Sequence, residues 1–209
     1  MKSYKQSVTI RGIVFSALFA ALMVVMSFIN IYIPPNPVPI TLENMGPMLA
    51  GALLGPGYGF LSIFLVVFLT ALGLPLMHGQ AGLSFVFGPT GGFIWMFPVS
   101  ALLTGWLISR IRGTGLVSYT KIFLAIWLSA LTVYVTGVPW LAHSLDVSFS
   151  KAVALGFTPF ILFDTLKAVA AAVIVIPVRK VFPTERLVGA RGVQVADLRD
   201  EANGANISK

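Results

Sequence analysis

The sequence contains no cysteine and few charged residues. Its 209 residues include no Cys, only 10% are charged, and only 7 are acidic. The absence of cysteine excludes disulfides and any metal site built on thiolates. The two histidines, His78 and His143, stand apart from other metal-ligating residues and predict no metal site. Nucleotide-binding, zinc and nucleophile-elbow motifs are also absent, so we predict neither an enzyme nor a bound cofactor.

Apolar residues dominate the chain. Hydrophobic residues make up 57% of it, and the mean hydropathy is +0.91. This composition is typical of a polytopic membrane protein. The net charge of +7 does not predict nucleic-acid binding, because the basic residues flank apolar runs instead of forming one basic stripe.

Proline, glycine and charged residues divide the chain into apolar segments, which predict an all-α fold of six transmembrane helices. We expect these helices at residues 10–30, 41–54, 57–77, 86–110, 120–141 and 158–180. The first follows a basic start but is long enough to span the bilayer and lacks a small-residue cleavage site, so we expect it to be retained. Residues 1–182 are predicted to form one membrane domain and 183–209 a mobile cytoplasmic tail.

The basic residues predict how the helices are oriented. They are concentrated before the first predicted helix, between the fourth and fifth, and after the sixth. The loops on the other side, 31–40, 78–85 and 142–157, contain a single lysine or arginine, Lys151. By the positive-inside rule we expect both termini to be cytoplasmic and the protein to be a multi-pass protein of the cell membrane.

Two charged residues lie inside the last apolar segment. Asp164 and Lys167 are three residues apart within "FILFDTLKAVAAAVIVI". This spacing puts both on one helix face, with their Cβ atoms about 5–6 Å apart. Ionisable groups at membrane depth usually face a bundle interior or a cavity and mark a binding site. The alternative is a structural ion pair that holds the last helix against its neighbours.

A proline-rich stretch precedes the second predicted helix. Residues 34–51 read "PPNPVPITLENMGPMLAG", and the prolines predict a stiff extended loop on the outer side. Thr41 is well placed as the N-cap of the following helix, with Glu43 in its first turn.

A glycine-rich stretch, residues 74–93, reads "LPLMHGQAGLSFVFGPTGGF". Its polar side chains include Gln80, Ser84 and Thr90, and backbone N–H groups at the following helix start could bind a carboxylate. Helix packing is an equally simple role for these glycines.

Four motifs in this order resemble those of the BioY family, the biotin-specific S components of energy-coupling factor (ECF) transporters. They are "PVPITLENMGPMLAGALLGP", "LGLP", "GPTGGF" and "DTLK", and the resemblance covers residues 12–182. It implies six helices with cytoplasmic termini and an outward-facing biotin pocket. It also implies association with a transmembrane coupling subunit and two ATPase subunits, although some members occur without a dedicated energising module, solitary or self-associating.

The resemblance assigns recognition of the ligand to Asp164 and Lys167, and a third polar contact to Gln80. A carboxylate accepts and an ammonium donates hydrogen bonds, so the pair suits the N–H and C=O groups of biotin's ureido ring. Glu43 stands where the family pattern has Gln. We do not expect Glu43 to contact the ligand directly, because a second carboxylate would repel an anionic vitamin.

The remaining predicted contacts involve the rest of the ligand. We expect Phe163, Val38 and Ile40 to contact its apolar ring and chain, and its carboxylate to point outward to Gln80 and loop amides. Thr41 and Thr90 complete the predicted set of ligand-binding residues.

The first helix predicts a partner surface. Ala17 and Ala21 have the small-xxx-small spacing that allows close helix approach, and in S components such a pattern resembles the contact face for the coupling subunit. Packing within the chain is the alternative.

Two rival functions remain at this point. One is a stand-alone secondary transporter or facilitator for biotin or a small carboxylate, with Asp164 as a proton-coupling group. The other is a scaffolding membrane protein with a stabilising ion pair.

Overall fold

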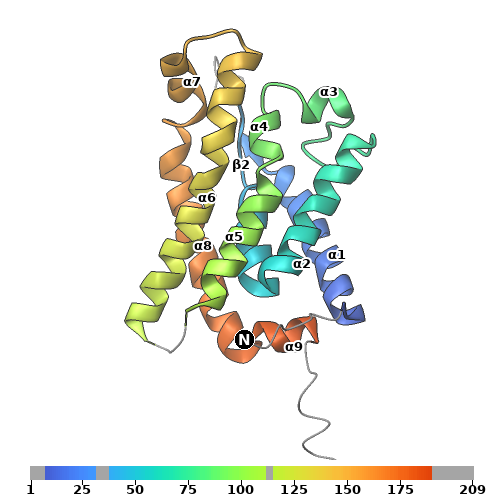
Figure 1. Cartoon of the computed structure of the whole chain (residues 1–209), viewed down its shortest axis with the longest axis vertical. Coiled ribbons are helices and arrows are strands. Elements are labelled where there is room, and N and C mark those ends of the chain that lie inside the picture. The colour runs from blue at the N-terminus through green and yellow to red at the C-terminus, as the bar shows by residue number, and fades with distance from the viewer. Residues whose placement is uncertain (1–7, 32–37, 112–114, 190–209) are drawn as a thin grey trace, which may run out of the picture.

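The computed structural model describes residues 8–31, 38–111 and 115–189. Its elements in chain order are α1 (Ile10–Ser27), β1 (Asn30–Ile31), β2 (Ile40–Thr41), α2 (Met45–Ala71), α3 (Leu83–Val86), α4 (Gly91–Ile94), α5 (Phe97–Ser109), α6 (Leu116–Ser144), α7 (Phe149–Gly156), α8 (Phe160–Val181) and α9 (Thr184–Val188). The long helices lie side by side along the long axis of the molecule, with α3, α4 and α7 at one end and α9 across the other (Figure 1).

The prediction of a polytopic helical membrane protein is confirmed. In the described part of the chain, five helical segments are long and apolar enough to cross a membrane: Ile10–Ser27, Met45–Ala71, Gly91–Ser109, Leu116–Ser144 and Phe160–Val181. The predicted count of six is met only in part, because the second and third predicted helices both fall within α2.

α2 is interrupted at Gly55, where φ is 81° and ψ is −179°, just before Pro56. A Cβ placed on Gly59 would lie 2.8 Å from the Cα of Gly51. Residues eight apart in a straight helix are separated by about 12 Å, so the chain must double back between them. α2 is therefore a hairpin of a short arm, residues 45–54, and a long arm, residues 56–71. This is the break that the sequence predicted at Gly55–Gly57.

α5 packs against this hairpin at backbone distance. A Cβ on Gly51 would overlap the carbonyl of Ala101, and one on Gly105 would overlap the backbone nitrogen of Pro56. Glycine is required at both positions, since any side chain would push α5 away from the turn.

The stretch before α2 differs from the prediction. Asn30 pairs with Thr41 and Ile31 with Ile40 in a short antiparallel ladder, so the fold is not purely α. Thr41 is therefore extended and does not cap the helix; α2 begins at Met45 with Asn44 as its N-cap residue. The expected prolines 34, 35 and 37 lie outside the described residues.

The two ends of the described chain meet. Thr9 precedes α1, and its hydroxyl donates a hydrogen bond to the carbonyl of Val188 at the end of α9. α9 falls within the stretch predicted to be a mobile tail, but Val188 is only 5% exposed. The rest of that stretch, residues 190–209, lies outside the described residues.

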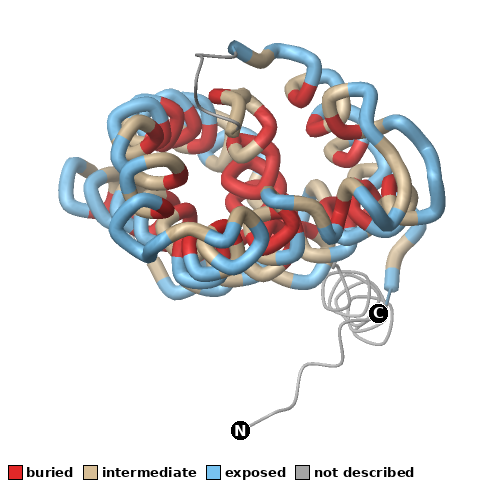
Figure 2. The backbone as a smooth tube through the Cα atoms, turned by 90° about the horizontal axis from the view of Figure 1, so that it is seen from above, coloured by how far each residue is buried: buried red, intermediate tan, exposed pale blue. Residues whose placement is uncertain are grey.

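Buried residues lie mostly on the parts of the backbone that face the interior of the bundle, and exposed residues lie on its outside (Figure 2). One apolar cluster packs the short arm of α2 against α6 and α8, on the side of the bundle nearer α9. Its fully or almost fully buried members include Met48, Leu49, Leu53, Ile126, Ala168, Ala171 and Val175. We call this group the basal cluster.

Candidate functional site

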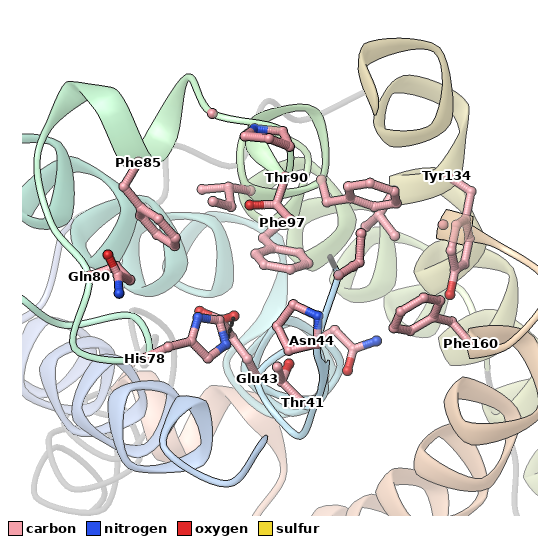
Figure 3. Close-up of a pocket in the computed structure, with 18 of the residues that line it drawn as sticks. Thr41, Glu43, Asn44, His78, Gln80, Phe85, Thr90, Phe97, Tyr134 and Phe160 are labelled. Atoms are coloured by element: carbon pink, nitrogen blue, oxygen red, sulfur yellow. Dashed lines mark ion pairs between the residues drawn. The ribbon is translucent and has the colours of Figure 1, made fainter. Parts of the chain in front are cut away.

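A cavity of about 400 Å³ lies between the start of α2, the 78–90 segment, α6 and α8. Figure 3 shows its wall: Tyr134 and Phe160 lie on one side, Gln80 and Phe85 on the opposite side, with Glu43 and His78 between them. The lining reaches exposed residues such as Gln80 and Ser84, so the cavity opens toward the end of the molecule that carries α3 and α4.

Two buried charges of the cavity, one of each sign, come from α8. Asp164 is 2% exposed and Lys167 is 7% exposed. The Lys167 Nζ atom lies 2.9 Å from Asp164 Oδ1 and 2.8 Å from Asn44 Oδ1 of the α2 start. The Tyr134 hydroxyl of α6 donates to Asp164 Oδ2. Three helices therefore hold this polar cluster in place.

Local sequence explains why these α8 residues share a face. Phe160, Asp164 and Lys167 follow i, i+4, i+7 spacing, which aligns side chains along one side of a helix. An ammonium has three donor hydrogens, of which two are used, and each carboxylate oxygen can accept more than one hydrogen bond. The cluster can thus offer both a donor and acceptors to a bound molecule.

A second polar pair lies in the cavity wall. Glu43 is 3% exposed, and its Oε2 atom lies 3.1 Å from His78 Nε2. The Glu43 Oε1 atom is buried with no hydrogen-bond partner among the described residues. His78 adopts φ 54°, a left-handed conformation that is uncommon for a residue with a side chain. No sequence pattern predicts that these two residues pair, because they are 35 positions apart.

Most of the predicted binding residues come together in this cavity. Its lining includes Val38, Thr41, Gln80, Thr90, Asp164 and Lys167. Glu43, which we did not expect to contact a ligand, lines it as well.

Phe163 and Ile40 do not line the cavity. Phe163 is 39% exposed on the outer surface of α8. Adjacent residues of a helix point about 100° apart, so a side chain next to Asp164 faces away from the face that Asp164 occupies. Phe160 takes the aromatic position on that face instead. Ile40 is 8% exposed and packs in the apolar core.

Several lining residues were not predicted. Phe160 could have been found from its i−4 spacing to Asp164, and Asn44 lies within the quoted "PVPITLENMGPMLAGALLGP" motif. Tyr134 carries no signal in the sequence, because only the packing of α6 on α8 brings it to Asp164. Its ring lies 5.9 Å from that of Phe93 and 5.0 Å from that of Phe157.

The arrangement suits a small molecule that combines a hydrogen-bonding head with an apolar body. Buried donors and acceptors on one wall would pair with N–H and C=O groups, while Phe93, Phe97 and Phe160 would cover apolar parts. Within the described residues, no group of three or more His, Asp or Glu side chains could hold a metal ion.

Comparisons with known proteins agree on one family. The model described as "BioY family" matches residues 1–184. The chain is 41% identical to "Probable biotin transporter BioY" of Pyrococcus horikoshii, over 76% of this chain and 90% of that protein. It is 37% identical to "Biotin transporter BioY" of Rhizobium etli, over 78% of this chain and 90% of the relative.

A solved structure is similar along nearly the same length. It is described as the "S-component for biotin from an ECF-type ABC transporter", and it matches with a TM-score of 0.76 and 30% identity. The match covers 82% of this chain and 92% of that structure.

Proposed function

This chain belongs to the BioY family, and we propose that it captures biotin as the substrate-binding (S) component of an ECF-type transporter. The relatives' names and the similar structure support this assignment. The observation on this chain that carries it is the buried cluster of Asp164, Lys167, Asn44 and Tyr134 in the wall of a cavity.

The cluster matches the chemistry of a ureido ring. The ring's carbonyl would accept the free ammonium hydrogen of Lys167, and its N–H groups would donate to Asp164. A site built from buried polar groups is selective, because a ligand that leaves them unpaired is penalised. Biotin's sulfur-containing ring and aliphatic chain would then lie against the aromatic wall, including Phe97 and Phe160.

The carboxylate of biotin would point to the open end of the cavity. Gln80 and Thr90 line that end, and the 78–90 segment offers backbone N–H groups. Glu43 would not repel the vitamin as strongly as the sequence implied, since its Oε2 atom lies against His78.

The charge distribution supports an orientation in which the cavity faces outside. The start of α1 and the ends of α5 and α8 lie at the α9 side of the molecule, away from the cavity (Figure 1). These helix ends and α9 carry Arg11, Arg110, Lys180 and Arg186. By the positive-inside rule this side, with the start of α1 and with α9, would be cytoplasmic in the cell membrane, in agreement with the expectation of cytoplasmic termini. Six membrane segments result when the two arms of α2 are counted separately, although a 10-residue arm spans only about 15 Å. The membrane domain then extends past residue 182 to include α9.

Energy for uptake would come from partners, a transmembrane coupling subunit and two ATPase subunits. Ala17 and Ala21 are exposed on α1, which leaves their small side chains available for a partner helix. If the protein works without these subunits, as a solitary or self-associated form, this same face of α1 would be the surface available for association.

Equilibrium binding of labelled biotin to the purified protein tests the site. We expect Asp164→Asn and Lys167→Met each to weaken binding about ten- to hundredfold, because a hydrogen bond to a charged group contributes about 1.5–3 kcal/mol. Asp146→Asn and Lys151→Met are matched controls, since both residues are exposed and lie outside the cavity. Near-wild-type affinity in both site variants would overturn the assignment.

A further inference from the structure

A second hollow lies at the opposite end of the molecule from the biotin cavity. It has a volume of about 600 Å³ and lies between the start of α1 and α9. Arg11 and Arg186 line it together with Glu185, and Ile10 and Phe182 supply apolar surface. We call it the basal groove.

Hydrogen bonds hold the walls of this groove in place. The Thr9 hydroxyl binds the carbonyl of Val188, and the backbone N–H of Thr9 donates to the Tyr58 hydroxyl at 2.8 Å. On the other side of α9, Arg179 Nη1 donates to the Thr184 hydroxyl at 3.0 Å. The groove is therefore a fixed feature of the fold and does not depend on a loose helix end.

Its two arginines are available to a ligand. Arg11 and Arg186 are exposed, and neither guanidinium makes an ion pair or hydrogen bond to another residue within the described ranges. Glu185 also lines the groove, but it interacts electrostatically with Arg179, a third cation nearby. The groove thus keeps an excess of positive charge.

The groove lies at the edge of the membrane-facing surface. Ile10 is 82% exposed and Phe182 is 53% exposed, continuous with exposed Ile13 and Val181 on the helices above. At the same end, Arg110 lies 3.7 Å over the Trp106 ring and Lys180 lies 4.9 Å over the Tyr119 ring. Cations paired with aromatic rings at helix ends are typical of the level of the lipid headgroups.

From this combination we infer that the basal groove binds an anionic phospholipid. The phosphate would lie between Arg11 and Arg186, where guanidinium groups donate paired hydrogen bonds to phosphate oxygens. The acyl chains would follow Ile10 and Phe182 into the bilayer. A soluble phosphate would use the arginines alone and leave this apolar surface in water.

The test uses the purified full-length chain and measures binding of phosphatidylglycerol and phosphatidylcholine by native mass spectrometry and by the shift in unfolding temperature. We expect phosphatidylglycerol to bind roughly ten- to thirtyfold more tightly than phosphatidylcholine. The double variant Arg11→Gln/Arg186→Gln should lose this preference, and Glu185→Gln should increase it. Arg110→Gln is the matched control and should keep it, because Arg110 lies at the same end but outside the groove.

Three outcomes would overturn the inference. The first is equal binding of both lipids to the wild type. The second is an equal thermal shift from inorganic phosphate at the same concentration, which would make the ligand a soluble anion. The third is a preference for phosphatidylglycerol that appears only when Asp197, Asp200 and Glu201 are neutralised together, which would make the chain's own acidic tail the occupant. Loss of biotin binding would leave the inference unaffected, because the two sites lie at opposite ends.

Discussion

Both carboxylate oxygens of Asp164 accept a hydrogen bond within the protein, Oδ1 from Lys167 and Oδ2 from Tyr134. These hydrogen bonds fix the direction in which the remaining lone pairs of the carboxylate point. Binding of a ligand that matches them therefore loses little free energy to the ordering of side chains. Tyr134 therefore positions the carboxylate, and Asn44 does the same for the ammonium of Lys167.

Tyr134→Phe tests this positioning. The change removes one donor from Asp164 and keeps the ring that packs on Phe93 and Phe157. We expect about tenfold weaker biotin binding with little loss of thermal stability, because a hydrogen bond to a charged group is lost while the packing remains. Equilibrium binding and unfolding temperature are the measurements, with Tyr119→Phe as control. Unchanged affinity would show that Lys167 alone orients Asp164.

The contact between Glu43 and His78 should contribute to the free energy of unfolding. His78→Ala leaves the Glu43 carboxylate buried without a partner, which costs about 3–5 kcal/mol. Adding Glu43→Gln removes the stranded charge, so the double variant should be more stable than His78→Ala alone. The unfolding temperatures of both single variants and the double variant measure this coupling. Additive losses would contradict it.

At the residue scale, the sequence predicted the cavity residues that are unusual for a membrane helix. Asp164 and Lys167 are conspicuous because charge in an apolar run is costly. Tyr134 is an ordinary aromatic residue by sequence, and its role depends on how α6 lies against α8. Phe163 was predicted in place of Phe160 because it is next to Asp164 in the sequence, whereas helical spacing puts Phe160, four residues before Asp164, on the same face.

A side chain of another helix, α8, donates a hydrogen bond to a backbone carbonyl at the turn of the α2 hairpin. The short arm ends at residue 54, so the carbonyls of its last turn, including that of Ala52, have no N–H group further along the same helix to bond with. Arg179 of α8 donates to that carbonyl at 2.7 Å and also binds Thr184 at the start of α9. One side chain thus ties together the α2 turn, α8 and α9.

Replacement of Arg179 should loosen all three elements. We expect Arg179→Met to lower stability by about 1–3 kcal/mol, because the Ala52 carbonyl loses its buried hydrogen bond. Arg179→Lys should lose less, since an ammonium can still reach one acceptor. Thermal unfolding and amide hydrogen exchange of α9 measure the effect. Equal stability of Arg179→Met and wild type would refute the link.

At the element scale, hydropathy predicted α1, α6 and α8 closely, since each is a long apolar run with clear ends. The turn at Gly55–Pro56 was also visible, because glycine and proline mark breaks. α7 and α9 were missed: each is short and lies where the sequence is less apolar, so hydropathy carried no signal. The pairing of β1 with β2 was missed because two-residue strands have no periodicity to detect.

At the scale of the whole molecule, α1 presents a face with small exposed side chains to its surroundings. α1 exposes Ala17 and Ala21, whereas Ser16 and Ala20 face the bundle. Ala17→Trp should therefore block uptake of biotin in cells by at least about tenfold while changing binding to the purified protein less than twofold. Leu128→Trp is the control, since Leu128 is exposed on α6. If binding is lost with Ala17→Trp, the face packs within the chain.

The absence of cysteine makes the proposed orientation easy to test. Ser150 of α7 and Ser109 of α5 are both exposed, at opposite ends of the molecule. In intact cells, a membrane-impermeant maleimide should label Ser150→Cys and should label Ser109→Cys only after permeabilisation. The native chain is the unlabelled control. The reverse pattern would invert the orientation and place the cavity on the cytoplasmic side.

The basal cluster has a consequence for the path of the vitamin. Its apolar side chains fill the bundle along α8 from Ala168 to Val175, between Lys167 above and Arg179 below. Within the described residues, this packing closes the cavity on the side of the basic helix ends, opposite its open end. A molecule bound in this cavity would leave through the open end by which it entered. Its transport across the membrane therefore requires the protein to change its orientation in the membrane or its conformation.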